Sequence, residues 1–283
     1  MGGRRLIAMM SAVAAAAVPL HLRAQSDPWA AVRRPSPGTS QPIGSAAAGC
    51  LAGAAMLPPQ GIGYQVLRLE RNRFYGHPST IAFVRRLAAE AAERHLGVLL
   101  VGDMAQPRGG PMPSGHGSHQ TGLDVDIWLE LPKAPLSDAE RAQPQSISMV
   151  KGRRVDRTVW GSPQARLLEL AARSPGVDRI FVNPAIKAEL CHSAGKDRAW
   201  LAKLRPWWGH DEHFHVRMAC PADDPACVPQ RPVPEGDGCG WELYSWLVKP
   251  TLPIPADRPN HRHPVLPAAC KAVLDGRAVA ASR

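Results

Sequence analysis

The chain has 283 residues and a formal net charge of +10, and 45% of its residues are hydrophobic. A chain of this length can bury one core that folds independently, so we predict a single domain. The positive charge favours an acidic polymer as partner. Nucleic acid is excluded as that polymer, because no basic stretch is interleaved with aromatic residues.

The N-terminus predicts a targeting segment rather than part of the fold. Arg4 and Arg5 precede an apolar, alanine-rich stretch at 6–20, and the small residue Ala24 stands at the expected cleavage edge. We therefore predict a secretory signal peptide over residues 1–24 and one domain over 25–283. No other stretch is long and apolar enough to cross a bilayer, so we expect no stable membrane insertion.

Periodicity and turn residues predict strands mixed with helices in no regular alternation, which is typical of an α+β fold. In chain order we expect an extended arm at 27–49, a helix at 79–93 capped by Ser79, a strand at 97–100, a loop at 106–115, a strand at 123–130, a helix beginning near 137, a helix at 164–173, a strand at 178–183, short helices at 184–191 and 196–204, a strand at 213–218, and a Pro-rich tail at 249–283.

All six cysteines follow the predicted signal peptide. An even number of cysteines in an exported protein predicts disulfides, although six cysteines allow 15 pairings. Cys220 and Cys227 are close enough to close a small local loop. Cys50 and Cys270 bracket the domain, so a bond between them would tie the tail back to its start.

The strand at 123–130 alternates apolar residues with Asp124, Asp126 and other polar residues. In the strand at 213–218, His213 and His215 alternate with apolar residues in the same way. Because residues i and i+2 share a face of a strand, both histidines should face one site. His119 lies in the small, polar loop that leads into the first of these strands.

These residues predict a zinc site. Zinc accepts imidazole nitrogen and carboxylate oxygen, and a catalytic zinc keeps three protein ligands and one open position. His119, Asp126 and one of His213 and His215 would supply the ligands, and the other late histidine would handle protons. A lone histidine pair is more often a surface or core feature, but the separate histidine and carboxylate favour the metal. The chemistry indicated is hydrolysis by activated water.

Four motifs resemble the penicillin-insensitive murein endopeptidases, from about residue 45 to the C-terminus. They are GHGSHQTGLDVD at 115–126, FVNPAIK at 181–187, RPW at 205–207 and HxHVR at 213–217. This family is one of the zinc peptidases that resemble lysostaphin, the D-Ala-D-Ala peptidases and the hedgehog domain. The resemblance implies an α+β fold in which an antiparallel sheet, flanked by helices and stapled by disulfides, forms the floor of a zinc cleft.

The resemblance also implies a role for each site residue. Zinc (Zn2+) would be held by His119, Asp126 and His215, with His116 either a further ligand or a neighbouring contact. His213 would be the general base. His210 would be a second catalytic residue, and Trp207 would line the cleft and contact the substrate. The implied disulfides are Cys50–Cys270, Cys191–Cys239 and Cys220–Cys227.

Two further residues carry alternatives. Arg217 would bind a substrate carboxylate or form a structural ion pair. Asp124 would orient a histidine or remain a solvated carboxylate on its strand.

The implied activity is hydrolysis of the D-alanyl–meso-diaminopimelate cross-link of peptidoglycan in the periplasm. β-Lactams acylate a serine nucleophile, which such a site lacks, so penicillin insensitivity is expected. The alternatives are a D-Ala-D-Ala carboxypeptidase or dipeptidase, and a non-catalytic zinc-containing domain that binds the cell wall. The presence of His213 favours a peptidase, because a binding domain needs no base.

Overall fold

The computed structural model describes residues 27–113, 115–249 and 264–278. The predicted signal peptide at 1–24 lies outside these residues. Within the described residues, no helix combines the length and apolar character that a bilayer span requires.

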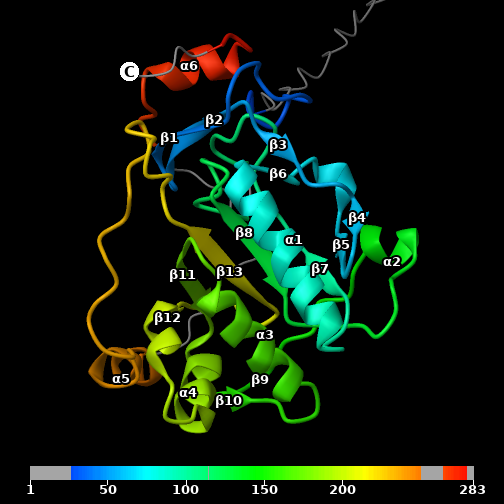
Figure 1. The fold of residues 1–283 in the computed structure, drawn as a ribbon, viewed down its shortest axis with the longest axis vertical. Helices are drawn as coiled ribbons and strands as arrows, with labels where there is room; N and C mark the ends of the chain where they lie inside the picture. The colour runs from blue at the N-terminus through cyan, green and yellow to red at the C-terminus, as the bar shows by residue number, and fades with distance from the viewer. Residues whose placement is uncertain (1–26, 114, 250–263, 279–283) are drawn as a thin grey trace, which may run out of the picture.

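A seven-stranded sheet runs through the centre of the molecule (Figure 1). Its spatial order is β12-β11-β13-β8-β7-β5-β4. The bounds of these strands are β4 Gln60–Gly61, β5 Tyr64–Val66, β7 Leu99–Val101, β8 Asp124–Trp128, β11 Val177–Val182, β12 Leu204–Pro206 and β13 His213–Met218. The predicted strands at 97–100, 123–130, 178–183 and 213–218 are therefore confirmed.

The sheet is mixed, so the prediction of an antiparallel sheet holds only for part of it. The central pairs β11–β13, β13–β8 and β8–β7 are antiparallel, whereas β5–β7 and β11–β12 are parallel. Each parallel pair is joined through a helix, α1 (Pro78–Glu93) or α4 (Pro184–Ser193). A crossover of this kind is what parallel neighbours require.

Helices α1 and α3 (Ser162–Arg173) pack in front of the sheet in the view of Figure 1. The core between them and the sheet contains Phe83 and Leu167 from the helices and Val125 and Phe214 from the strands, all fully buried. Because side chains alternate along a strand, the acidic and histidine positions of β8 and β13 lie on the opposite face.

Helix α1 begins at Pro78, one residue earlier than predicted. Its N-cap is His77, whose Nδ1 accepts a hydrogen bond from the Ser79 backbone N–H at 3.2 Å. Pro78 occupies the first helical position, where its missing N–H costs nothing. The prediction that Ser79 caps the helix was therefore wrong.

The segment predicted as an extended arm contains an antiparallel hairpin. Its strands are β1 (Gln41–Ser45) and β2 (Ala48–Ala52). Two short strands, β3 (Ala55–Met56) and β6 (Tyr75–Gly76), pair beside it. The remaining elements are η1 Leu69–Arg71, α2 Asp138–Ala142, β9 Val150–Lys151, β10 Arg154–Val155, η2 Ala199–Lys203, α5 Trp241–Val248 and α6 Ala269–Leu274.

Three disulfides fasten the chain, with the pairing that the family resemblance implies. Cys50–Cys270 joins β2 to α6, Cys191–Cys239 joins α4 to the segment before α5, and Cys220–Cys227 closes a local loop after β13. Helix α6 lies within the predicted tail and is held to the N-terminal hairpin (Figure 1).

Candidate metal centre

Strand pairing brings two of the predicted donors together. In the antiparallel register of β8 and β13, His215 lies opposite Asp126 and Arg217 lies opposite Asp124. Residues that are 89 or more positions apart in the sequence thus become direct neighbours. The buried apolar residues that alternate with them determine this register, because a shift of one residue would turn the acidic and histidine side chains into the core.

The loop before β8 is held against the N-terminal hairpin. Gln120 donates to the carbonyl of Ala47 at 2.9 Å and accepts from the N–H of Gly49 at 3.1 Å. Gly122 closes the loop with φ of 71°, and a Cβ there would lie 2.3 Å from the Leu51 side chain. These contacts of Gln120 and Gly122 hold the backbone that directly follows His119, and they thereby position His119.

His119 itself has φ of 66°, a left-handed conformation that is uncommon for a residue other than glycine. Its side chain is fully buried, and its backbone N–H donates to Asp124 Oδ2 at 3.3 Å. Strained backbone of this kind persists where its surroundings determine it, and it often occurs at functional sites. Here it directs the imidazole toward Asp126.

The separations of the donor atoms fit a single small metal ion. Nε2 of His119 and Nδ1 of His215 each lie 3.4 Å from Oδ1 of Asp126. Donors at about 2.1 Å from a tetrahedral zinc would lie about 3.4 Å from one another. His119 and His215 therefore each approach Asp126 at the spacing of ligands that share one ion.

The same atoms are polar, buried and unsatisfied. Within the described part of the chain, both ring nitrogens of His119 and Oδ1 of Asp126 lack a hydrogen-bond partner. Buried polar groups without partners are costly, and native proteins keep few of them. A cation between Nε2 of His119 and Oδ1 of Asp126 would satisfy these two atoms, so the residues present fit a metal.

Asp124 fixes the orientation of His215. Its Oδ1 accepts from His215 Nε2 at 2.7 Å and from Arg217 Nε at 2.6 Å. With Nε2 occupied, His215 presents Nδ1 toward Asp126. Asp124 is fully buried, which excludes the alternative of a solvated strand carboxylate.

His116 belongs to the same cluster. Its Nδ1 is 3.5 Å from Oδ2 of Asp126, and one donor atom from each of His116, His119 and Asp126 lies within 4.8 Å of the others. Its Nε2 makes a 2.9 Å hydrogen bond with Asp103, which also pairs with Arg73 at 2.8 Å.

Asp103 is a residue that the sequence interpretation missed. It follows the buried strand β7, and a carboxylate at the end of a buried strand was the available signal. Burial alone would raise the pKa of Asp103, but His116 and Arg73 hold it well below its usual range. Asp103 therefore stays ionised and can orient His116.

His213 and His210 lie beside this cluster rather than inside it. Nε2 of His213 is 3.8 Å from Asp126 Oδ2, and its side chain is 27% exposed. The rings of His210 and His213 are 5.1 Å apart, and Nδ1 of His210 lies 3.1 Å from the carbonyl of Trp208. The structure thus brings together every histidine that the sequence singled out.

Electrostatics favour neutral His210 and His215 next to an ionised Asp126. Burial lowers the pKa of His210 to about 3 and the pKa of His215 to about 4. Burial alone would raise the pKa of Asp126, but His119 and His213 hold it well below its usual value. A neutral imidazole is the form that coordinates a metal.

His119 shows the attraction of this site for positive charge. Burial alone would lower its pKa, but the adjacent Asp126 raises it above the ordinary value. A metal cation would take the place of the proton that this pair attracts.

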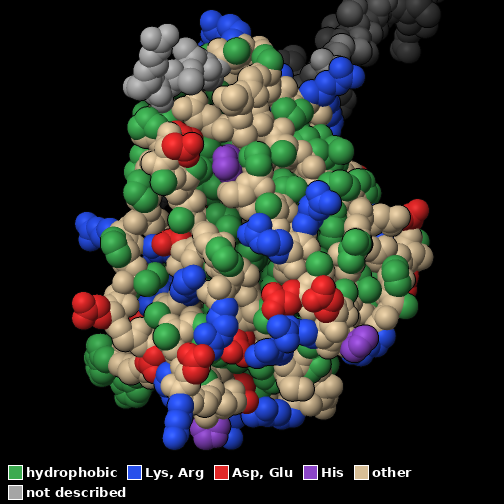
Figure 2. Space-filling view, viewed as in Figure 1, with side chains coloured by type: hydrophobic (Ala, Val, Ile, Leu, Met, Phe, Trp, Pro, Cys, Tyr) green, Lys and Arg blue, Asp and Glu red, His purple; other side chains and the backbone are tan. Residues whose placement is uncertain are grey.

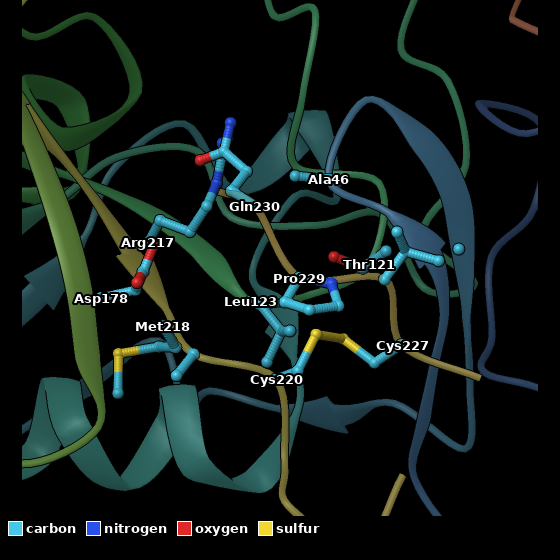
Figure 3. Close-up of a pocket in the computed structure, with 13 residues that line it drawn as sticks. Ala46, Thr121, Leu123, Asp178, Arg217, Met218, Cys220, Cys227, Pro229 and Gln230 are labelled. Atoms are coloured by element: carbon cyan, nitrogen blue, oxygen red, sulfur yellow. A yellow bond between two sulfur atoms is a disulfide. The ribbon is translucent and has the colours of Figure 1, made fainter. Parts of the chain in front are cut away.

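Trp207 and Arg217 flank the site in different ways. Trp207 is 49% exposed, and its ring packs edge-to-face on Phe181, which packs in the same way on His215. Arg217 is buried, with its guanidinium 5.3 Å from the centre of the Phe181 ring. It lines a cavity of about 60 Å³ that Asp178, Gln230 and the Cys220–Cys227 disulfide also line (Figure 3). The ion pair with Asp124 supports the structural alternative for Arg217, and its contact with substrate stays a prediction.

Comparison with known proteins identifies the same family that the sequence motifs resemble. The family model described as penicillin-insensitive murein endopeptidase matches residues 42–275. A Haemophilus influenzae protein named penicillin-insensitive murein endopeptidase is 50% identical over 252 residues, which are 87% of this chain and 88% of that protein. Proteins of the same name from Salmonella heidelberg and Salmonella paratyphi C are 48% identical over 250 residues, which are 88% of this chain and 91% of theirs. The chain therefore belongs to the penicillin-insensitive murein endopeptidase family.

Proposed function

We propose that this protein is a zinc metallopeptidase that hydrolyses the D-alanyl–meso-diaminopimelate cross-link of peptidoglycan and is insensitive to β-lactams. The observation that carries the proposal is that His119 and His215 each lie at ligand spacing from Asp126, with His213 and His210 beside them. Family membership supports the same reaction, because the relatives are named for it.

In this proposal His119, Asp126 and His215 hold the metal, and His116 supplies a further donor through Nδ1. When bound, zinc lowers the pKa of water toward about 7 and polarises the scissile carbonyl. Asp124 and Asp103 position His215 and His116 by hydrogen bonds to their outer nitrogens, which is the usual arrangement for metal-binding histidines.

His213 is the general base. It lies at the edge of the donor cluster, and its partial exposure gives it access to water and substrate. It takes the proton of the attacking water and returns it to the leaving amine.

His210 assists His213. A neutral His210 that donates through Nδ1 to the carbonyl of Trp208 leaves Nε2 as a hydrogen-bond acceptor. We therefore assign His210 to receive a hydrogen bond from the neighbouring base or from substrate, rather than to donate to an oxyanion.

The cell compartment and domain limits are part of the same proposal. Residues 1–24 act as a signal peptide, and residues 25–283 act as one metallopeptidase domain in the periplasm. Three disulfides fit an oxidising compartment. The net charge of +10 fits approach to the anionic cell wall.

The test incubates the purified mature protein with cross-linked muropeptide dimers and follows products by mass spectrometry. Parallel reactions contain penicillin, a zinc chelator, or the chelator followed by added zinc. We expect dimers to become monomers with penicillin present, to persist with chelator, and to be cleaved again after zinc is restored. Release of terminal D-alanine alone would instead identify an exopeptidase. Intact dimers with zinc-loaded protein would identify a binding domain.

A further inference from the structure

Helix α5 carries an aromatic surface that the proposed reaction does not use. Trp241 is 78% exposed and Tyr244 is 53% exposed, and their rings lie 5.4 Å apart. On another side of the helix, Trp246 packs on Trp207 at 5.6 Å and on Trp208 at 5.7 Å. We call Trp241, Tyr244 and Trp246, together with Val248, the α5 surface.

The exposed residues share one face of the helix. Positions 241, 244 and 248 follow helical spacing, and Val248 is 51% exposed. Leu243 is the buried residue of α5. Hydrophobic side chains gather at the lower left of Figure 2, where Figure 1 places α5. A contiguous group of exposed apolar side chains is a feature of interaction sites, whereas single exposed apolar residues are normal.

The helix that carries this surface is firmly anchored. Cys239, just before α5, is bonded to Cys191 on α4. The buried Lys187 donates to the carbonyl of Asp237 at 2.6 Å, and Arg198 pairs with the Asp237 carboxylate at 2.7 Å.

Further anchors lie on α5 itself. Arg205 on β12 forms an ion pair with Glu242, and Arg153 donates to the carbonyl of Leu247 at 2.8 Å. These contacts fix the helix from several sides, while its aromatic face stays in solvent. The helix is therefore preorganised for binding, because binding would cost little conformational entropy.

A row of ring contacts leads from the metal centre to Trp246 on α5. Ring-to-ring contacts run from His215 to Phe181 at 5.3 Å, from Phe181 to Trp207 at 5.8 Å, and from Trp207 to Trp246 at 5.6 Å. An extended four-residue stem peptide spans about 14 Å. A stem of that length, with its cross-link at the metal centre and its chain along this row of rings, would carry its sugar end in the direction of α5.

We propose that the α5 surface binds the glycan strand of peptidoglycan, through stacking of its N-acetylated sugars on Trp241 and Tyr244. Sugar rings present flat C–H faces that pack on aromatic rings, while their hydroxyl and amide groups remain hydrated. The centres of the two rings are 5.4 Å apart, so both rings can contact one short stretch of a glycan chain. Tyrosine and tryptophan suit such half-wet contacts, because each combines an apolar ring with a polar atom.

This proposal rests on the proposed function, since it assumes that the substrate is a peptide borne on a glycan. The binding test is separate from catalysis. It uses the His213→Ala protein, in which cleavage is expected to be at least about 100-fold slower, and measures retention on purified sacculi by sedimentation. Adding Trp241→Ala and Tyr244→Ala should weaken retention roughly tenfold or more, as loss of aromatic anchors does at binding surfaces.

The matched control is Ile62→Ala, which removes another exposed hydrophobic side chain (79% exposed) from the opposite edge of the sheet, between β4 and β5. This control should bind as the parent does. The double variant Trp241→Phe, Tyr244→Phe should retain most of the binding, because it keeps both aromatic rings. Circular dichroism confirms that each variant keeps its fold.

The activity test uses the protein with His213 intact and two substrates. Loss of Trp241 and Tyr244 should slow release of cross-links from intact sacculi, yet leave cleavage of a sugar-free cross-linked peptide within about twofold. A peptide-free N-acetylglucosamine oligosaccharide should also quench tryptophan fluorescence of the parent protein only.

Equal retention of parent and double variant on sacculi would overturn the glycan assignment. The assignment would also be overturned if the double variant lost the parent's binding to anionic lipid vesicles but kept its binding to sacculi. That result would make α5 a membrane contact. Failure to cleave either substrate, with glycan binding intact, would overturn the proposed function and leave this inference standing.

Discussion

Asp124 accepts hydrogen bonds from both His215 and Arg217 through one oxygen, Oδ1, at 2.7 and 2.6 Å. The carboxylate is fully buried. Burial alone would raise its pKa, but Arg217 and His215 hold that pKa well below its usual range. Asp124 is therefore a permanent anion behind His215, and it fixes which ring nitrogen of His215 faces Asp126.

The first prediction concerns this anion. Asp124→Asn keeps the shape of the side chain but removes its charge, so His215 loses its charge-assisted acceptor. We expect zinc affinity to fall about 10- to 100-fold, the range typical of outer-sphere partners of metal ligands. Competition with a chromogenic chelator measures the affinity.

Asp138→Asn is the control for Asp124→Asn, because the Asp138 side chain is 99% exposed on α2. It should leave zinc affinity unchanged. Wild-type zinc affinity in Asp124→Asn, with normal folding, would remove Asp124 from the proposed site.

The second prediction concerns metal and stability. Removal of zinc leaves His119 and Asp126 buried without partners, so the free energy of unfolding should fall. Zinc at 100 times its Kd adds about 2.7 kcal/mol, or roughly 5–10 °C in Tm for a domain of this size.

Calorimetry with and without chelator measures the shift in Tm. His119→Ala is the matched variant, and its Tm should not respond to zinc. A wild-type Tm that is independent of zinc would show that the donor cluster does not bind the metal in the folded state.

The third prediction concerns pH and the buried Lys187. Burial lowers its pKa to about 8 from an ordinary 10.5, with Arg205 adding to the effect. Between these values the unfolded chain holds more protons than the folded chain. Lys187 therefore makes the free energy of unfolding rise with pH across this window, by about 3 kcal/mol in total.

Urea unfolding of oxidised protein at pH 7.5 and pH 10 measures this contribution as the difference between wild type and Lys187→Met. We expect the wild type to gain stability relative to the variant as pH rises. Parallel pH profiles would mean that Lys187 titrates in the fold as it does in water.

The alternation of apolar and polar residues in β8 and β13 made the central residues of the site predictable. Asp124, Asp126, His213 and His215 each share a face with their i+2 partner, and the buried residues between them leave one register. Pairing of β8 with β13 could not be derived from periodicity alone, because contact between segments so distant depends on the whole fold. The residues alone left open which of His213 and His215 is the ligand, and the family resemblance implied His215 and the full disulfide pairing.

Other elements were missed for identifiable reasons. The crossovers that make β5–β7 and β11–β12 parallel depend on the spatial order of strands, which local sequence does not encode. Helix α5 follows a stretch rich in glycine and proline, and WELYSWLV is apolar on several faces, so it lacks the single stripe of an amphipathic helix. Asp103 escaped notice because its role depends on His116, which lies 13 residues away.

The central claim is that His215 holds the metal and His213 moves protons. The most direct test measures zinc content and cleavage of cross-linked dimers together in His213→Ala and His215→Ala, with exposed His192→Ala as control. We expect His213→Ala to keep its zinc but to cleave about 100- to 10,000-fold more slowly. We expect His215→Ala to lose both zinc and cleavage, and His192→Ala to lose neither. Loss of zinc from His213→Ala, or full activity in either of the two site variants, would refute these roles of His213 and His215.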